Sequence, residues 1–456
     1  SYAAGTNETS GLIFAVRGLF GGYPGVFAIT PYYLKVREYS DIENRDVWEY
    51  QLNLTPQEID RLLMHLWELG PTHFDYYFFD ENCAYHLLSL LEVARPGLRL
   101  TDRFRWWAIP SDTVRAVTEE PGLLKRVVYR PASVTIMQQR LKHMDVAQHG
   151  LARDLGKQQI VPADERIRKL PAQDQARVLE FGYEYAAYES ATGRGQQANA
   201  IDHMRNILLA RSRLDVPPQK PEVPVPAVRP DEGHKTSRIG MGAGSRDGRR
   251  FQEIHLRPTY HDLLYDDAGY TRGAQIQFFD MRWRHYRGDD GLRLEEFRPL
   301  DIASLSPRND FFKPVSWKVN VGWARKRIAR EVEPLVFQLN LGPGLAYGLS
   351  GLFGGSAVYY GFIEAALDVG KGFTDDYAVG AGPSIGLLAN LSDRWKMNLH
   401  ARALRYGLGD DHHARELVLE TRYALTRQSA LGLQLYRKQE FQNYWNGGDI
   451  NLNIYF

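Results

Sequence analysis

The only cysteine of the chain, Cys83, lies in the stretch DYYFFDENCAYHLLSLLE, residues 75–92, where a helix is predicted to begin. It follows Asp80, Glu81 and Asn82, a polar run that suits a helix N-terminus. A thiol there lies near the positive end of the helix dipole and near free backbone N–H groups, and both favour the thiolate. A thiolate can attack a carbonyl carbon, and the N–H groups can stabilise the resulting oxyanion. The residues alone leave two interpretations open: Cys83 is a catalytic nucleophile, or it is a small residue of the core.

A cysteine nucleophile also needs a base within hydrogen-bonding reach. His86 follows Cys83 by three residues and therefore shares a helical face with it, whereas His73 lies in a predicted loop before it. Asn82 and Glu81 are the polar neighbours that could support the cysteine. Structural or solvent-facing roles are the alternative for each of these four side chains.

Two predicted helices must position this segment. The first, TPQEIDRLLMHLWELG over 55–70, has Thr55 as N-cap, Pro56 in its first turn and Glu58 to complete a capping box. Its predicted apolar face consists of Leu62, Leu63, Leu66 and Trp67. The second begins near the cysteine and runs to Ala94, before the sequence RPG. Residues 1–54 are predicted to be mostly extended, with glycine-rich turns, and residues 133–215 to form further helices.

Composition limits the classes of function. The 456 residues are 24% charged and 44% hydrophobic, which excludes general disorder. The net charge of +1 gives no field that would attract nucleic acid, so no nucleic-acid partner is expected. A single cysteine excludes an intramolecular disulfide and a cysteine-based metal cluster. The chain begins at Ser1 without a methionine, so a missing signal peptide carries little weight.

No cofactor or metal ion is expected either. The glycine-rich stretch GLFGGYPG is not followed by the strand, loop and Gly-Lys-Ser helix start that bind nucleotide phosphates. The sequence DDHH over 410–413 falls in a predicted hairpin turn, where solvated side chains are the ordinary interpretation. Arg45 lies in the charged block YSDIENRDVWEY and could contact a phosphate head group, because guanidinium matches phosphate oxygens. A solvated loop is the alternative for Arg45.

The second half of the chain has a different pattern. After the proline-rich segment over 215–233, a predicted linker, helical periodicity gives way to strict alternation. The segments that alternate are 236–244, 250–261, 273–286, 292–304, 315–327, 333–349, 354–369, 376–390, 394–407, 412–425, 429–441 and 448–456. Strands of about ten residues are long for a soluble sandwich but suffice to cross a bilayer when tilted.

Two architectures fit this alternation. A transmembrane barrel would direct the apolar residues outward, whereas a soluble sandwich or lipocalin-like barrel would direct them inward. The chain ends on a predicted strand with Phe456, which resembles the C-terminal signature of bacterial outer-membrane barrels and favours the first. Aromatic residues near strand ends are then predicted to form interfacial girdles: Tyr286, Trp317, Trp395, Tyr406 and Tyr444.

Three blocks within roughly the first 135 residues carry a family resemblance. They are GLFGGYPGVFAITPYYLKVREYSDIENRDVWEYQLNLT, LWELGPTHFDYYFFDENCAYHLLSLLEVARP and WAIPSDTVRAV. In this order they resemble the periplasmic domain of the Lnb-type lipoprotein N-acyltransferase family. The helical region and the β-rich end that follow resemble the architecture of the same family.

The resemblance implies a fold and a reaction. It implies an α+β, permuted papain-like N-terminal domain, related in layout to the lecithin–retinol acyltransferases, which also carry an Asn-Cys pair at a helix start. It implies that an acyl chain passes from a phospholipid donor, through a thioester on Cys83, to the N-terminus of a lipoprotein acceptor. In the permuted fold the catalytic histidine precedes the cysteine. Family members carry a Gly-His block upstream of the part that begins here at Ser1, so the base is expected there and the N-terminus is expected to be incomplete.

The expected layout has four parts. They are a periplasmic cysteine acyltransferase domain over 1–132, a helical extension over 133–214, a proline-rich linker over 215–235, and an outer-membrane β-barrel of about 12 strands over 236–456. The barrel would contact outer-membrane lipid. Two other functions remain open: a papain-like cell-wall peptidase or amidase with the same nucleophile, and a non-catalytic outer-membrane binding protein.

Overall fold

The computed structural model describes residues 1–6, 17–18, 21–193, 199–218, 221–328, 332–351 and 356–456. These residues form two compact units, Ser1–Pro226 and Ala227–Phe456, each of which is described by itself. The first unit contains the cysteine and the second contains the alternating strands. Leu19 and Phe20 of the glycine-rich stretch lie outside the described residues.

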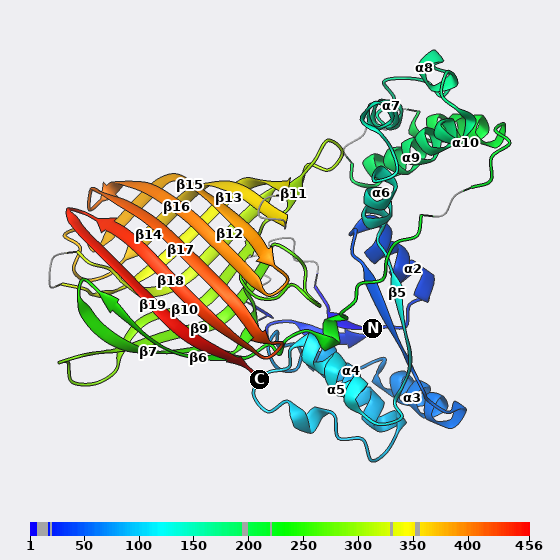
Figure 1. Ribbon diagram of the computed structural model, residues 1–456. Helices are drawn as coiled ribbons and strands as arrows, with labels where there is room; N and C mark the ends of the chain where they lie inside the picture. The colour runs from blue at the N-terminus through cyan, green and yellow to red at the C-terminus, as the bar shows by residue number, and fades with distance from the viewer. Residues whose placement is uncertain (7–16, 19–20, 194–198, 219–220, 329–331, 352–355) are drawn as a thin grey trace. The chain divides into compact units, whose positions relative to one another are not determined.

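The region around the cysteine combines two small sheets with short helices (Figure 1). A three-stranded antiparallel sheet has the order β1 (Tyr2–Ala4), β2 (Pro24–Phe27), β4 (Phe74–Asp75). A two-stranded antiparallel ribbon pairs β3 (Val47–Leu52) with β5 (Leu124–Arg130). The helices are α2 (Tyr32–Arg37), α3 (Pro56–Leu69), α4 (Cys83–Ala94) and α5 (Pro110–Glu119), with a π-helix η1 (Glu38–Ile42) and a 3-10 helix η2 (Thr101–Arg103).

Helices α3 and α4 begin where the sequence predicts. Thr55 accepts a hydrogen bond from the backbone of Glu58 at 3.3 Å, and the Glu58 carboxylate accepts one from the Thr55 N–H at 2.8 Å, so the capping box is formed. Helix α4 is anchored by Leu88, which is buried with Leu100, Val117 and Leu123.

The predicted apolar face of α3 is only partly used for packing. Leu62 and Leu66 are half-buried, whereas Leu63 is exposed and 86% of Trp67 is exposed. None of the residues of α3 is buried. The helix forms as predicted, but its apolar face is covered only in part: α3 packs against α4 along one side, and the rest of its apolar surface stays uncovered by the described residues.

The rest of the first unit is helical, as predicted for 133–215. Its helices are α6 (Ser133–Leu141), α7 (Val146–Gly156), α8 (Glu165–Arg168), α9 (Ala172–Ala191) and α10 (Ala200–Ser212). Helices α7 and α9 approach closely at two glycines: a Cβ on Gly156 would lie 2.7 Å from the Tyr185 ring, and one on Gly182 would lie 2.7 Å from Leu155. Among the described residues, none of these helices combines the length and apolar composition needed to cross a membrane.

The second unit is a closed antiparallel β-barrel of twelve strands (Figure 1). Its strands are β6 (Arg238–Arg246), β7 (Arg249–Arg257), β9 (Ala274–Tyr286), β10 (Arg293–Ser304), β12 (Ser316–Arg325), β13 (Leu335–Ser350), β14 (Ser356–Val369), β15 (Tyr377–Ser392), β16 (Trp395–Gly409), β17 (His412–Thr426), β18 (Ser429–Glu440) and β19 (Asn443–Tyr455). The ring closes because β19 pairs with β6, with Ile450 opposite Ala243. The short strands β8 (Thr259–His261) and β11 (Pro307–Arg308) and the 3-10 helix η3 (Pro230–Glu232) lie in the connections. All twelve alternating segments of the sequence correspond to barrel strands.

The apolar face of the strands points outward, as a membrane barrel requires. On β16, Trp395 and Leu399 are exposed, whereas Lys396 and Asn398 are buried. Leu417, Leu433 and Ile450 on neighbouring strands are exposed in the same way, with exposed fractions of 50%, 40% and 57%. The soluble-barrel alternative, with apolar residues inside, is therefore excluded.

The predicted aromatic girdle was wrong at two positions. Trp317, Trp395 and Tyr444 are exposed, but Tyr286 and Tyr406 are each 3% exposed. Tyr406 stacks on His412 inside the barrel, with ring centroids 4.2 Å apart. Neighbouring residues of a strand alternate between the two faces, so nearness to a strand end could not show which face a tyrosine takes.

Candidate active site around Cys83

Cys83 is the first residue of α4 and its side chain is half-buried. The helix begins there because Asn82 has an extended backbone and serves as N-cap. The Asn82 side-chain oxygen accepts hydrogen bonds from the N–H groups of Ala84 and Tyr85, at 3.0 Å and 3.2 Å. This capping fixes the first turn of α4, and with it the position of the thiol.

The amide nitrogen of Asn82 holds two further segments against the helix start. It donates hydrogen bonds to the backbone oxygens of Phe78, at 3.1 Å, and Ala108, at 2.6 Å. The Ala108 N–H in turn donates to the backbone oxygen of Phe79 at 2.7 Å. Asn82 is 3% exposed, so all of these bonds are shielded from water. Asn82 is thus both the cap of α4 and a clamp: its side chain joins the segment between β4 and α4 to the loop before α5.

Tyr76 supplies a hydroxyl group next to the thiol. The hydroxyl lies within hydrogen-bonding reach of the side chain and the backbone of Cys83. Burial and, after it, the neighbouring Cys83 raise the pKa of Tyr76 well above its usual range. The hydroxyl therefore keeps its proton at neutral pH and remains a hydrogen-bond donor at the sulfur.

Aromatic rings form the wall behind Tyr76. The Tyr2 ring stacks on Tyr76 with centroids 5.9 Å apart and contacts Phe27 at 4.7 Å. Tyr2 itself is 3% exposed, and burial, followed by the charge of Glu81, raises its pKa to about 12. This wall makes one side of the thiol apolar.

His86 lies one turn beyond Cys83 and is enclosed by this wall. Its ring centroid is 4.3 Å from that of Tyr2 and 5.1 Å from that of Phe74. It is 7% exposed, and its Nε2 atom has no hydrogen-bond partner among the described residues. Burial lowers the pKa of His86, so its imidazole is neutral at pH 7. A neutral imidazole keeps one nitrogen that can accept a proton, but burial makes this one a weaker base than a solvated histidine.

The other predicted site residues, Glu81, His73 and Arg45, are exposed to solvent. Glu81 is exposed at the start of α4, and its charge acts on the hydroxyls of Tyr2 and Tyr85. His73 is exposed in the turn just before β4. Arg45 pairs with Glu43 at 3.1 Å, and its side chain is 70% exposed, so it belongs to the solvated charged surface of the loop before β3.

The glycine-rich stretch before β2 packs against this site. A Cβ on Gly18 would lie 2.4 Å from the Phe78 ring, and one on Gly25 would lie 1.8 Å from the Tyr2 hydroxyl. The backbone oxygen of Gly18 also accepts a hydrogen bond from the Phe78 N–H at 3.0 Å. These glycines allow the chain to approach the aromatic wall, which accounts for them without a bound phosphate.

An ion pair between partly exposed side chains joins α3 and α4. Arg95, just after α4, contacts Glu58, at the start of α3, with 2.6 Å between Nε and Oε1. The hydrogen bond from Arg95, together with the backbone N–H of Thr55, lowers the pKa of Glu58 to about 2. The pair therefore holds the end of α4 against the start of α3 whenever the carboxylate is ionised.

The arrangement provides a nucleophile, a proton-retaining donor and an apolar wall. The sequence indicated Cys83 and Asn82, but it did not single out Tyr76 or Tyr2. The density of aromatic residues in FDYYFF immediately before the cysteine is the signal that could have indicated Tyr76. Tyr2 is 81 positions away from Cys83 in the chain, and only the β1–β2–β4 sheet brings it close. Within the described ranges, no three His, Cys, Asp or Glu side chains are arranged to hold a metal ion.

Three protein families match successive parts of the chain. Residues 1–120 match the Lnb N-terminal periplasmic domain, which confirms the predicted resemblance at the level of that domain. Residues 127–223, the helical part, match the domain of unknown function DUF7842. Residues 227–455, half of the chain, match the domain of unknown function DUF7840. Among curated proteins, none matches the chain.

Solved structures similar to the chain include three outer-membrane proteins. OmpT of Vibrio cholerae is 7% identical, with 48% of this chain and 96% of that chain covered and a TM-score of 0.26. Omp33 of Acinetobacter baumannii is 10% identical, with 49% and 99% covered and a TM-score of 0.27. An anion-selective porin from Comamonas acidovorans is 9% identical, with 49% and 98% covered and a TM-score of 0.23. Identities and TM-scores this low carry no functional information.

The location of the protein follows from the first family and from the barrel. A closed barrel with an apolar outer surface is a structure that spans the bacterial outer membrane. The match to a periplasmic domain places the first unit in the periplasm. The first barrel strand begins at Arg238 and the last ends at Tyr455, so both termini of the barrel lie at the same end. The chain enters the barrel at this end from the first unit, so this end faces the periplasm.

Proposed function

The chain belongs to the family that is defined by the domain of unknown function DUF7840, and we propose that it is a lipoprotein N-acyltransferase with Cys83 as its nucleophile. The acyl donor is a phospholipid and the acceptor is the N-terminal amine of a lipoprotein. The fold proposed for the periplasmic domain is a permuted papain-like fold. The match of residues 1–120 to the Lnb N-terminal periplasmic domain supports this proposal.

One observation carries the proposal: Cys83 opens a helix, and its half-buried side chain lies beside the Tyr76 hydroxyl. A core cysteine would be surrounded by apolar groups, whereas this thiol is half-buried and adjoins a donor that stays protonated. Such a donor can stabilise the negative charge that develops on sulfur or on an oxyanion. The aromatic wall of Tyr2, Phe27 and Phe74 is suited to an acyl chain next to the thiol.

The reaction has two halves. In the first, the Cys83 sulfur attacks the ester carbonyl carbon of the phospholipid, the carbon–oxygen ester bond breaks, and the lysophospholipid oxygen takes up a proton. In the second, the lipoprotein amine attacks the thioester carbon, the carbon–sulfur bond breaks, and the amine loses a proton as the amide forms. A base must take the thiol proton and return it. His86 and His73 are the histidines of this region that variants can test for that role.

The decisive experiment uses the full chain in phospholipid vesicles of one defined acyl composition. Mass spectrometry should find a mass increase of one such acyl group on the peptide that contains Cys83. Cys83→Ser should fold as before and lose N-acylation of a lipoprotein acceptor, because the hydroxyl is far less readily ionised than the thiol. Normal N-acylation by Cys83→Ser, or hydrolysis of cell-wall peptides without any acyl adduct, would overturn the proposal.

A further inference from the structure

The inside of the barrel is packed, and its packing is arranged in layers. At the periplasmic end, the connection between β7 and β9 turns into the lumen. Leu264, in this connection, is 7% exposed and packs with Leu305, Ala346, Phe362 and Leu388. The last three are inward-facing strand residues, and such positions are polar in a water-filled barrel. The connection therefore meets an apolar surface that the barrel wall provides for it.

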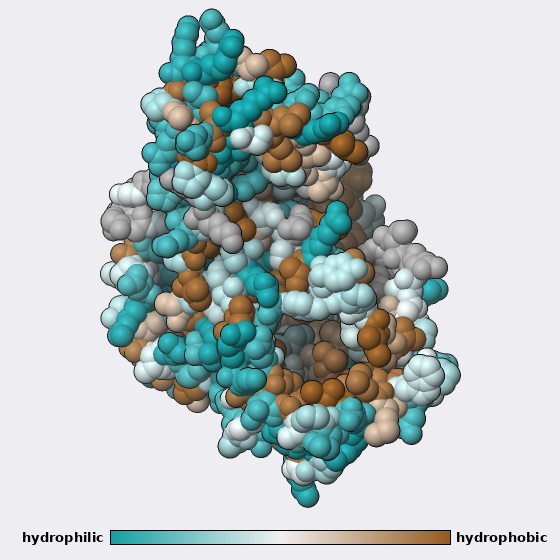
Figure 2. Space-filling view, turned by 90° about the vertical axis from the view of Figure 1, so that its right-hand side faces the viewer, coloured by the Kyte–Doolittle hydropathy of each residue, from teal (hydrophilic) through white to brown (hydrophobic). Residues whose placement is uncertain are grey.

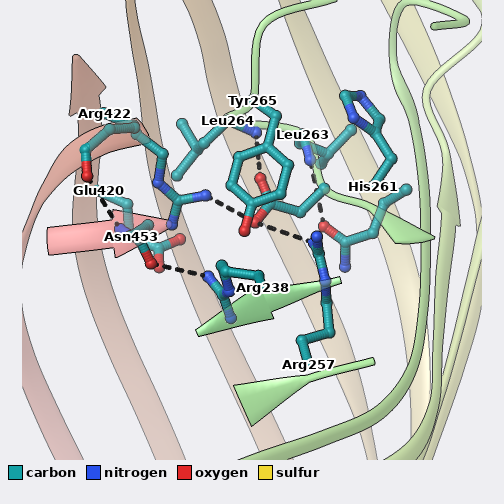
Figure 3. A network of polar contacts seen from close by, with 12 residues as sticks. Arg238, Arg257, His261, Leu263, Leu264, Tyr265, Glu420, Arg422 and Asn453 are labelled. Carbon is teal, nitrogen blue, oxygen red and sulfur yellow. Dashed lines mark hydrogen bonds and ion pairs between the residues drawn. The ribbon is translucent and has the colours of Figure 1, made fainter. Parts of the chain in front are cut away.

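Charged groups fix this connection to several strands (Figure 3). Asp262 pairs with Arg422 of β17 at 2.7 Å, and its carboxylate also accepts a hydrogen bond from the Leu264 N–H at 2.9 Å. Lys396 of β16 donates to the backbone oxygen of Tyr265 at 2.8 Å and pairs with Asp267 at 2.7 Å. Strands β16 and β17 lie across the ring from β7 and β9, so these bonds span the lumen.

Tyr265 is the centre of the same layer, and it is 1% exposed. Figure 3 shows its ring between three arginine side chains. The guanidinium carbons of Arg422, Arg257 and Arg238 lie 4.5 Å, 4.7 Å and 5.8 Å from the ring centroid. Arg257 is fully buried and Arg238 is 2% exposed. Cations that are this well covered gain from an aromatic face because water is excluded from them.

Between the two ends of the barrel, the lumen contains ion pairs in which both side chains point into the barrel. Glu364 of β14, 1% exposed, pairs with Lys318 of β12 at 2.5 Å and with Arg402 of β16 at 3.8 Å. Arg402 also pairs with Glu416 of β17 at 3.0 Å. These pairs connect strands up to two positions apart in the ring, so opposite charges inside the barrel lie next to each other.

The outer end has a second apolar layer. Phe373 and Phe441, from two outer connections, pack with the inward-facing Leu404 and Tyr406. Lys326, just after β12, pairs with Glu440 of β18 at 3.0 Å. Strands β12 and β18 are six positions apart in the ring of twelve, so this pair joins opposite walls. Asn443 donates to the backbone oxygen of Ile328 at 3.2 Å, again across the opening.

From these layers we infer that the DUF7840 barrel is a sealed membrane anchor and not a channel. Residues 258–273, named here the plug, close the periplasmic end, and Lys326, Phe373 and Phe441, named here the outer cluster, close the other. The inference concerns the barrel alone and is independent of the chemistry at Cys83.

Conductance of the purified full chain in planar lipid bilayers tests the inference. Four proteins are compared: the wild type, a plug variant lacking residues 262–268, the outer-cluster variant Phe373→Ala/Phe441→Ala, and the combination of both. A heat-dependent shift in gel mobility verifies that each barrel is folded. The wild type and the single variants should show no current above the bare bilayer, and the combined variant should show channel steps. Wild-type channels, or a folded combined variant without current, would overturn the inference.

Chemical labelling tests the plug by itself. In a Cys83→Ser background, Leu264→Cys should resist a membrane-impermeant maleimide until the barrel is unfolded, because Leu264 is packed inside the lumen. Arg272→Cys, at an exposed position of the same connection, is the matched control and should react in the folded protein. Equal reaction rates at the two positions in the folded barrel would show that the plug does not occupy the lumen.

Discussion

The Tyr76 hydroxyl lies beside Cys83, the first residue of α4, and Cys83 is the neighbour that, after burial, raises the pKa of Tyr76 most. This pair defines the site more narrowly than the cysteine alone, because it adds a donor whose proton is retained at neutral pH. Figure 2 shows that hydrophobic and hydrophilic side chains lie side by side on one face of the molecule. Three predictions concern this pair and the elements that hold it, and two concern the barrel.

Tyr76→Phe removes the hydroxyl and keeps the ring that stacks on Tyr2. We expect the rate of acyl-adduct formation on Cys83 to fall about 10²-fold, the cost of losing one donor to a developing negative charge. The melting temperature should change little, because the apolar contacts remain. Tyr77→Phe, at the adjacent tyrosine, is the control and should retain activity. An unchanged rate in Tyr76→Phe would remove Tyr76 from the reaction.

Two substitutions of Asn82 separate its cap from its clamp. Asn82→Ala loses both and should cost about 0.5–2 kcal/mol for the cap alone. Asn82→Asp keeps an acceptor for the Ala84 and Tyr85 N–H groups but places a carboxylate against the backbone oxygens of Phe78 and Ala108. We therefore expect Asn82→Asp to be at least as destabilising as Asn82→Ala in thermal unfolding at pH 7. A stable Asn82→Asp protein would show that only the cap matters.

The Glu58–Arg95 pair predicts a pH dependence of the first unit. The pKa of Glu58 is lowered to about 2 in the folded state, below its ordinary value, so folding favours the ionised carboxylate. The stabilisation is fully present above the ordinary pKa of a glutamate and is lost as the pH falls toward 2. Thermal unfolding followed by tryptophan fluorescence should show this loss in the wild type. Glu58→Gln should be less stable than the wild type at pH 7, and this difference should shrink as the pH falls toward 2.

The stability lost when a charge is placed on the outward face of the barrel should depend on the depth of that position in the membrane. Leu399→Arg, at an outward-facing position in the middle of β16, should destabilise the barrel by roughly 2–4 kcal/mol. Leu425→Arg, near the end of β17, makes the same change close to the membrane surface and should cost about 0–1 kcal/mol. Both leucines are outward and similarly exposed, at 39% and 41%. Equal folding yields of the two variants in phospholipid vesicles would contradict the assigned depth.

The ion pairs inside the barrel predict a strong effect of losing one partner. Lys326→Met leaves Asp368 and Glu440 facing each other without a cation, and should destabilise the barrel by about 3–5 kcal/mol. Neutralising the partners as well, in Lys326→Met/Asp368→Asn/Glu440→Gln, should recover most of that loss. Urea unfolding in vesicles measures both. A triple variant no more stable than Lys326→Met would show that the charges are not the cause.

Within the first unit, local signals predicted the helices but not their packing. Thr55, Glu58 and Asn82 act through backbone groups within three residues of themselves, so their caps are readable in the sequence. The exposure of Trp67 was not readable, because it depends on which segments cover α3. For the same reason the sequence placed His86 on the helical face of Cys83 but could not show the rings of Tyr2 and Phe74 around it.

For the barrel, the sequence by itself determined the number of strands and which residues share a face, because alternation along a strand is a local property with a period of two. It left open whether the apolar face points outward or inward, since both kinds of barrel have the same period. It also indicated Cys83, since a helix start is encoded by its neighbours. Only the tertiary structure decided what meets across space: Tyr76 at the thiol, Lys326 opposite Glu440, and the plug inside the lumen. Ring closure and sheet formation join residues that are far apart in the chain, and no local pattern specifies which of them become neighbours.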